Sequence, residues 1–169
     1  KYGTAFIKGI QDNGLIACAK HFPGHGNTDT DSHTSLPTIE GSQEELDVLE
    51  LYPFKQAVQS GVKMVMVGHI ALPGLDDRGV PVSHSSIITT KLLRERIQFD
   101  GIIITDGMEM GGLTQTAWAG ESAVRAVEAG VDILLLPMDV NHSITSIEEA
   151  VQSGRISEER INKSVARIW

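Results

Sequence analysis

The sequence has little of the material that several classes of protein require. It contains a single cysteine, Cys18, which excludes an internal disulfide and leaves the cellular compartment open. Lysine and arginine number 14 against 22 aspartates and glutamates, and the net charge is −8. No basic cluster occurs, which argues against a nucleic-acid partner. No apolar run approaches the roughly 20 residues that a membrane span needs. The first residues are neither an initiator methionine nor a signal peptide, and we expect the chain to be part of a longer protein.

What the sequence does contain is ordinary for a globular protein. Its 169 residues suit one domain and are enough to bury a core. Hydrophobic residues make up 41% and charged residues 21%, which are typical values. Low-complexity segments and linkers are missing, so we expect one domain or part of one.

The stretch from Lys20 to His33 concentrates titratable side chains. Its 14 residues hold three of the six histidines, two aspartates and a lysine. It directly follows the apolar run 15–19, which Gly14 opens and which is typical of a short buried strand. In chains that alternate strands and helices, active sites lie in the loops that follow strands. The stretch is therefore the first candidate for an active-site loop.

Four segments repeat one order: a helix, a glycine, a buried strand and a polar residue. The expected strands are 15–19, 62–67, 102–104 and 131–136. Such apolar runs predict strands that are covered on both faces, and alternation with helices predicts a parallel α/β sheet. Four strands fit either a small doubly wound sheet or half of an eight-stranded barrel.

The intervening segments predict helices with recognisable ends. Ser42 and Glu45 form the pattern of a capping box for a helix that Pro53 must interrupt or kink. Ser157 is expected to cap the last helix. The other helices are expected around 92–97, 121–129 and 144–151.

Asp31 and His33 are the first candidate pair. Residues two apart in an extended segment face the same side, so Asp31 can fix the tautomer of His33 for general acid–base work. The alternative is a surface Asp and His in a polar loop. Histidines and aspartates of this stretch are also possible metal ligands, but Phe22-Pro23-Gly24 prevents the helix that the His21–His25 spacing would suit. The prediction is therefore that no metal is bound.

Asp106 ends the most apolar of the expected strands. A carboxylate at the carboxyl end of a buried parallel strand points into the ligand crevice, whereas the alternative is a cap for the following turn. Lys20 and His21 end the first expected strand, and His69 occupies the matching place after the second. These three are expected to contact a polar ligand, with a structural role as the alternative. The glycines of Gly24-His25-Gly26 do not form a phosphate-binding loop, and the sequence predicts no cofactor.

Together these motifs resemble glycoside hydrolase family 3, in particular its β-N-acetylglucosaminidases. The resemblance rests on Lys20-His21-Phe22-Pro23-Gly24-His25-Gly26, on Asp31-Ser32-His33 with Leu36-Pro37, and on 101–106 followed by Met110. Leu92-Leu93-Arg94 and Phe99 also fit the pattern, so the resemblance covers nearly the whole chain.

The resemblance implies a fold and a set of roles. It implies a (β/α)8 TIM-type barrel, of which residues 1–169 supply strands 5–8 as part of a single catalytic domain. The remaining half of the barrel is then a required partner. It further implies that Asp106 is the nucleophile, that His33 is the acid–base held by Asp31, and that Lys20 and His21 bind sugar hydroxyls.

The activity that the resemblance implies is retaining removal of terminal β-linked N-acetylglucosamine, from peptidoglycan fragments. The substrate is thus expected to be a small carbohydrate. Alternatives are a β-glucosidase, a glycoside phosphorylase, attack by the acetamide of the substrate itself, a catalytically silent carbohydrate-binding half-barrel, and a metal-dependent hydrolase.

Overall fold

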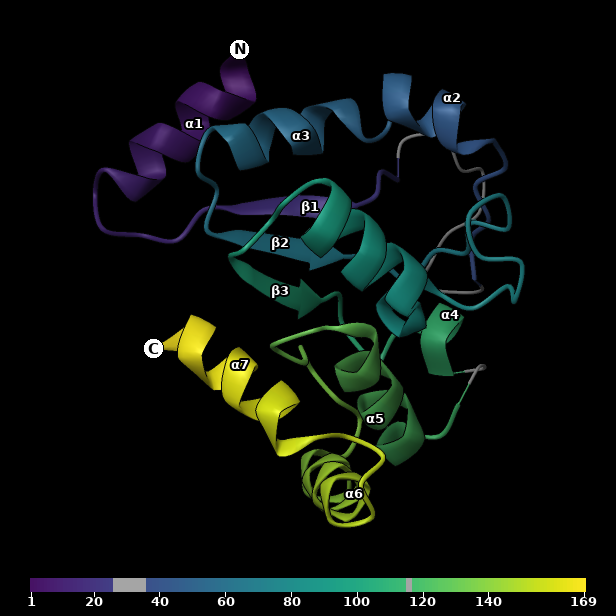
Figure 1. Cartoon of the computed structure of the whole chain (residues 1–169). Coiled ribbons are helices and arrows are strands. Elements are labelled where there is room, and N and C mark those ends of the chain that lie inside the picture. The colour runs from purple at the N-terminus through teal and green to yellow at the C-terminus, as the bar shows by residue number, and fades with distance from the viewer. Residues whose placement is uncertain (26–35, 115–116) are drawn as a thin grey trace.

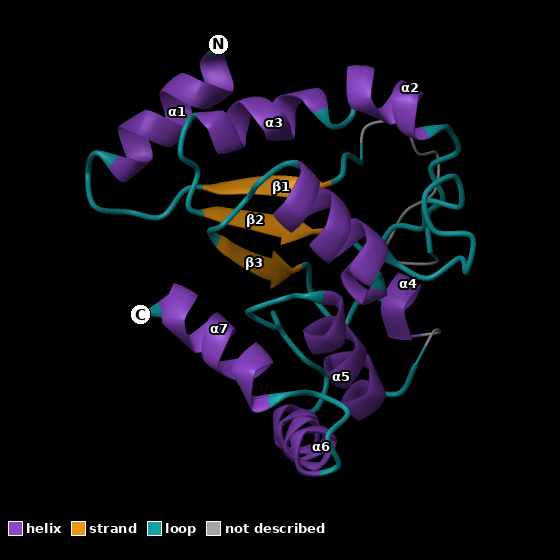
Figure 2. Ribbon diagram, in the orientation of Figure 1, coloured by secondary structure: helices purple, strands orange, loops and turns teal. Residues whose placement is uncertain are grey.

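A computed structural model describes residues 1–25, 36–114 and 117–169 of the chain (Figure 1). Helices and strands alternate through most of it, as Figure 2 shows. The strands are β1 (Cys18–Phe22), β2 (Met64–Val67) and β3 (Ile102–Thr105). The helices are α1 (Tyr2–Gln11), α2 (Gln43–Val48), α3 (Tyr52–Gln59), η1 (Val82–His84, 3₁₀), η2 (Ile87–Arg96, a π-helix), α4 (Gly111–Thr114), α5 (Ala119–Ala129), α6 (Val140–Gln152) and α7 (Glu158–Ile168).

The sheet is parallel and its strands lie in sequence order, β1-β2-β3. Met64 pairs with Cys18 on one side and with Ile102 on the other. The carboxyl ends of all three strands therefore meet at one edge of the sheet, where the arrowheads of Figure 1 point. This edge brings together the residues that follow the strands.

Two of the predicted strands differ from the structure. The first lies at Cys18–Phe22 instead of 15–19, because Leu15 and Ile16 are exposed and only the later residues pair with β2. The run 131–136 forms no strand and joins the sheet through a single parallel bridge between Ile104 and Ile133. Next to that bridge, Leu135 N–H donates to the Thr105 hydroxyl at 2.9 Å, so a side chain replaces one rung of the ladder.

Helices cover only one face of the sheet. Val65, Val67 and Ile103 project from the strands into the main core, where they meet apolar side chains of α1, α3 and η2. The opposite face is open along β1 and β2, where Cys18 and Lys20 are exposed and Met64 and Met66 are half-buried. At β3 the same face is covered, since Ile102 and Ile104 are buried. In a (β/α)8 barrel the helices cover only one face of the sheet, whereas in a doubly wound fold they cover both faces.

The predicted helix ends are largely confirmed. Ser42 accepts the N–H of Glu45 while the Glu45 carboxylate accepts the N–H of Ser42, which completes a capping box at α2. Pro53 does not kink one helix but lies in the first turn of a second, α3, where its missing N–H costs nothing. The Ser157 hydroxyl caps α7 by accepting the N–H of Arg160.

The C-terminal helices form a smaller apolar cluster beside the sheet. Val124 and Val127 of α5 pack against Ala150 of α6 and Ile156 of the following turn. Figure 1 shows α6 at the end of the molecule opposite to α1, with α7 between α6 and β3. Within the described ranges, none of the helices has the length and apolarity needed to span a membrane.

Candidate active site

Asp106 stands at the centre of the edge where the strands end. Its backbone N–H donates to the Val67 carbonyl at 2.9 Å, so it still continues the ladder between β3 and β2. Its carboxylate Oδ1 accepts the N–H of Gly107 at 2.9 Å. The side chain is 20% exposed, and Oδ2 faces His21 at the end of β1. One carboxylate oxygen is thus fixed by the protein while the other is available to a ligand.

His21, from the end of β1, places its imidazole beside that oxygen. Its Nε2 lies 3.6 Å from Asp106 Oδ2, and its side chain is 30% exposed. Burial lowers the pKa of His21 and outweighs the negative charge of Asp106, which raises it; Lys20 and His25 lower it further. At neutral pH the imidazole is therefore uncharged, and it can exchange a hydrogen bond with a ligand without forming a salt bridge to the carboxylate.

The space for the His21 ring depends on a glycine in the neighbouring strand end. A Cβ on Gly68 would lie 3.4 Å from the Cβ of His21 and 3.1 Å from Cδ1 of Ile70. Gly68 also donates its N–H to the Phe22 carbonyl at 3.0 Å, which ties it to β1. A larger residue here would have to displace one of those side chains.

His69 follows β2 and lies behind Asp106. It is 1% exposed, and both ring nitrogens meet protein atoms: Nδ1 lies 2.9 Å from Ser83 Oγ and Nε2 lies 3.1 Å from the Gly107 carbonyl oxygen. Burial lowers the pKa of His69, while the charge of Asp106 acts in the opposite direction. The structure thus brings His69 to the predicted edge, and its contact with substrate stays a prediction.

The other predicted site residues have different outcomes. Lys20 lies on β1 directly before His21 and is exposed. Asp31 and His33 lie outside the described residues, so their proposed dyad stays a prediction.

Two neighbours of Asp106 were missed by sequence reasoning. Ser83, in η1, is fully buried against His69, and nothing in its surrounding sequence indicates that contact. Leu136 is 55% exposed at φ +47°, a conformation that bulky residues rarely adopt. Its Cδ1 lies 4.0 Å from the position of a Cβ on Gly107, the residue after Asp106.

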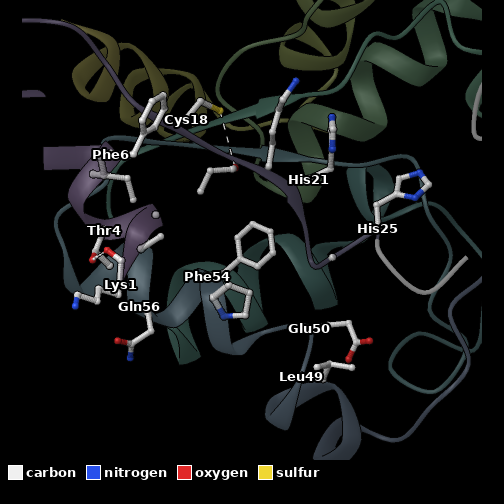
Figure 3. Close-up of a pocket in the computed structure, with 17 residues that line it drawn as sticks. Lys1, Thr4, Phe6, Cys18, His21, His25, Leu49, Glu50, Phe54 and Gln56 are labelled. Atoms are coloured by element: carbon white, nitrogen blue, oxygen red, sulfur yellow. Dashed lines mark hydrogen bonds between the residues drawn. The ribbon is translucent and has the colours of Figure 1, made fainter. Parts of the chain in front are cut away.

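A cavity of about 850 Å³ opens at the free edge of β1 (Figure 3). Its walls come from α1, β1, α3 and the segment before α3. Phe54 projects into its centre, and His21 and His25 lie along its rim in the close-up. The cavity therefore reaches from the unpaired side of the sheet to His21, which lies next to Asp106.

Metal ligation finds no support in the part of the chain that the structure describes. Within residues 1–25, 36–114 and 117–169, no group of three or more histidine, cysteine, aspartate or glutamate side chains could hold a metal ion. Asp29, Asp31 and His33, which the metal alternative also used, lie outside those ranges.

The arrangement defines a class of protein. A carboxylate that is 20% exposed, with a neutral imidazole beside it on the carboxyl edge of a parallel sheet, suits nucleophilic or acid–base attack on a polar ligand. The fold and this edge are those of α/β enzymes that carry their site on strand ends.

Comparison with known proteins identifies the family. Residues 1–169 match the model of the glycosyl hydrolase family 3 N-terminal domain, and the chain belongs to that family. A β-hexosaminidase of Neisseria meningitidis serogroup C is 37% identical over the whole chain, which spans 44% of that relative. A β-N-acetylglucosaminidase/β-glucosidase of Cellulomonas fimi is 33% identical over 98% of the chain, which spans 31% of it.

Solved structures show the same likeness. A glycoside hydrolase family 3 β-N-acetylglucosaminidase from a Paenibacillus species is 43% identical, with a TM-score of 0.95 over 98% of this chain and 32% of its own. The beta-glucoside phosphorylase BglX is 26% identical, with a TM-score of 0.92 over 98% of this chain and 31% of its own. The chain thus spans 31–44% of the length of these four relatives.

Proposed function

We propose that the protein carrying this chain is a retaining exo-β-N-acetylglucosaminidase that acts on peptidoglycan fragments. The observation that carries the proposal is the Asp106 carboxylate, with one oxygen fixed by Gly107 N–H and the other facing the ligand side. Membership of glycosyl hydrolase family 3 and the 37–43% identity to a β-hexosaminidase and a β-N-acetylglucosaminidase support the choice of sugar.

In the proposed reaction Asp106 is the nucleophile and His33 the acid–base. An oxygen of Asp106 attacks the anomeric carbon, the glycosidic C–O bond breaks, and His33 protonates the departing oxygen. The sugar is then held as an ester of Asp106. In the second half His33 takes a proton from water, the water oxygen attacks the same carbon, and the Asp106 carboxylate leaves. Two displacements at one carbon retain its configuration.

The supporting roles follow from the neighbours of Asp106. A protonated His21 at 3.6 Å would neutralise the nucleophile, so the neutral form favoured by burial leaves Asp106 its full charge. His21 and Lys20 are then free to hydrogen bond sugar hydroxyls. Asp31 holds the His33 ring and favours its charged form, which is the form needed for the first step.

We further propose that residues 1–169 supply strands 5–8 of a (β/α)8 barrel. The support is the parallel order β1-β2-β3 with a bridge to Ile133, helices on one face only, and a cavity along the free edge of β1. An eight-stranded barrel would place the remaining strands against both edges of this sheet and close its open face.

The test is covalent trapping in the full-length protein. A fluorinated N-acetylglucosaminyl fluoride accumulates the ester, and peptide mapping by mass spectrometry locates it. We expect the label on Asp106 in the wild type and none in Asp106→Asn. Cleavage of aryl N-acetylglucosaminides without a label would favour attack by the acetamide. Neither cleavage nor label would contradict the proposed activity.

A glycoside phosphorylase is the second candidate, because the beta-glucoside phosphorylase BglX shares the fold with a TM-score of 0.92. Phosphate would then replace water in the second displacement. Reaction of the trapped or natural intermediate in phosphate buffer distinguishes the two: hydrolysis gives the free sugar, whereas phosphorolysis gives the sugar 1-phosphate. We expect the free sugar.

A further inference from the structure

The hydrogen bonds of His69 determine which of its nitrogens carries the proton. A carbonyl oxygen can only accept, so the contact at 3.1 Å requires Nε2–H to donate to Gly107. Nδ1 then accepts the hydroxyl of Ser83 at 2.9 Å, since the neutral ring has one N–H. His69 and Ser83 are 1% and 0% exposed, so both hydrogen bonds are shielded from water.

The atom that His69 holds belongs to the residue after the candidate nucleophile. Gly107 has no side chain, and glycine backbone adopts many conformations unless something restrains it. Here its N–H donates to Asp106 Oδ1, and its carbonyl accepts from both His69 Nε2 and the backbone N–H of Met110. On the other side of Asp106, the backbone N–H is bound to Val67. Together these contacts restrain the backbone on both sides of the carboxylate.

Catalysis depends strongly on this kind of restraint. A displacement of about 1 Å between nucleophile and reacting carbon can cost on the order of 100-fold in rate. The Gly107 carbonyl also accepts the N–H of Met110 at 3.1 Å. Without the His69 donor only that contact among the described residues would hold the oxygen, so the φ and ψ angles of Gly107 would be less restrained and its N–H could move away from Oδ1 of Asp106. Ser83 in turn hydrogen bonds to the His69 ring, which donates to the Gly107 carbonyl.

We propose that His69 is a positioning residue for the reaction: through the Gly107 backbone it holds the Asp106 carboxylate in its attacking orientation, and Ser83 fixes its tautomer. The inference rests on the proposed function of Asp106. It assigns His69 a role without substrate contact, in place of the ligand contact that its strand-end location predicted.

The test compares three variants of the full-length protein with the wild type. His69→Phe fills the space and removes the donor, whereas His69→Gln can still present an N–H towards Gly107. His84→Phe is the matched control, because His84 is also a buried histidine (8% exposed) on a serine, with Nε2 3.0 Å from Ser122 Oγ. The steady-state readout is hydrolysis of an aryl N-acetylglucosaminide.

We expect His69→Phe to lower kcat about 30- to 100-fold with KM within about threefold. His69→Gln should recover most of that loss, and His84→Phe should keep kcat within about twofold. A higher KM at unchanged kcat would mean that His69 binds substrate, which would overturn the proposal. Equal losses in His69→Gln and His69→Phe would also overturn it.

Crystal structures of the same variants give a readout that does not depend on activity. In His69→Phe the Asp106 carboxylate should leave its place beside His21, and in the other two variants it should keep it. If the wild type hydrolyses no N-acetylglucosaminide, the proposed function fails, and these structures still decide the positioning role. An unmoved Asp106 in His69→Phe would refute it.

Discussion

At the scale of single residues, burial determines the charge of the histidines around Asp106. Burial is the largest influence on the pKa of His21, His69 and His84, and it lowers all three. For His84 the pKa falls to about 4, with the positive charges of His69 and Arg125 acting in the same direction and Glu121 opposing them. Its Nδ1 is buried with no hydrogen-bond partner among the described residues. A proton there has nothing to stabilise it.

This gives a prediction for stability against pH. The pKa of His84 is about 4 in the folded chain and about 6.5 when unfolded, so folding favours the neutral form. Its contribution is complete above pH 6.5 and is lost as the pH falls towards 4, up to about 3 kcal/mol. Denaturant unfolding at a series of pH values measures it. The comparison is His84→Gln, which does not titrate and can still hydrogen bond Ser122.

We expect the free energy of unfolding of the wild type to fall more steeply between pH 6.5 and 4 than that of His84→Gln. The paired carboxylates Asp76 and Glu121, whose pKa values are held at about 2, also reduce stability below about pH 5, but they do so in wild type and variant alike, so the difference between the two curves reports His84. Parallel curves for wild type and variant over the whole interval would show that His84 is not buried in its neutral form.

Single residues at strand ends were the most predictable part of the site. Asp106, His21 and His69 meet at one edge because parallel strands end together, and this follows from the alternation of glycine, apolar run and polar residue. The partners of His69 could not be predicted. They lie 14 and 38 residues away in the sequence, and no local pattern records contacts of that range.

At the scale of whole elements, one buried aspartate joins two helices, η2 and α7, to the sheet. The side chain of Asp132 is fully buried and accepts the N–H of Ile103 at 2.9 Å at the start of β3. Arg94 of η2 donates to the same oxygen, and Arg167 of α7 lies 3.1 Å from the other. Ser164 of α7 also donates to that second oxygen at 2.5 Å. The network holds the end of the sheet opposite to Asp106.

Removing the charge should therefore be costly. Asp132→Asn keeps the shape but leaves the buried guanidinium groups without a counter-charge, and we expect a loss of about 3 kcal/mol or more. Asp12→Asn is the matched control, since Asp12 pairs with Lys8 at 2.7 Å on the exposed side of α1, and it should change stability by less than about 0.5 kcal/mol. Urea unfolding at neutral pH measures both. Similar losses for the two variants would contradict the structural role of Asp132.

Element boundaries were less predictable than element types. The helix caps at Ser42 and Ser157 follow from local chemistry and are confirmed. The apolar run 131–136 has the composition of a strand, but Leu135 bonds to a side chain and Leu136 turns to a positive φ. Strand pairing depends on neighbours across the sheet, which apolarity alone does not specify.

At the scale of the molecule, the sheet has one covered face and one open face. The face with Cys18, Lys20, Met64 and Met66 lacks the helices that bury Val65 and Val67. The strands are apolar on both faces, but the described helices cover only one of these faces. In the proposed barrel this open face becomes the interior, packed by side chains from the other strands.

Cys18 offers a direct test of that closure. Its side chain is exposed in this chain and borders the cavity at the free edge of β1. In a complete barrel the thiol would point among packed side chains, and its labelling would require a local opening of the fold. We expect N-ethylmaleimide to modify Cys18 of the full-length protein at least about tenfold more slowly than an exposed thiol, as followed by peptide mass spectrometry. The reference is a thiol introduced by Ser153→Cys, in the exposed turn after α6. Denaturant should equalise the two rates, which shows that the difference comes from folding. Equal rates in the native protein would mean that nothing covers the open face, and the barrel proposal would be wrong.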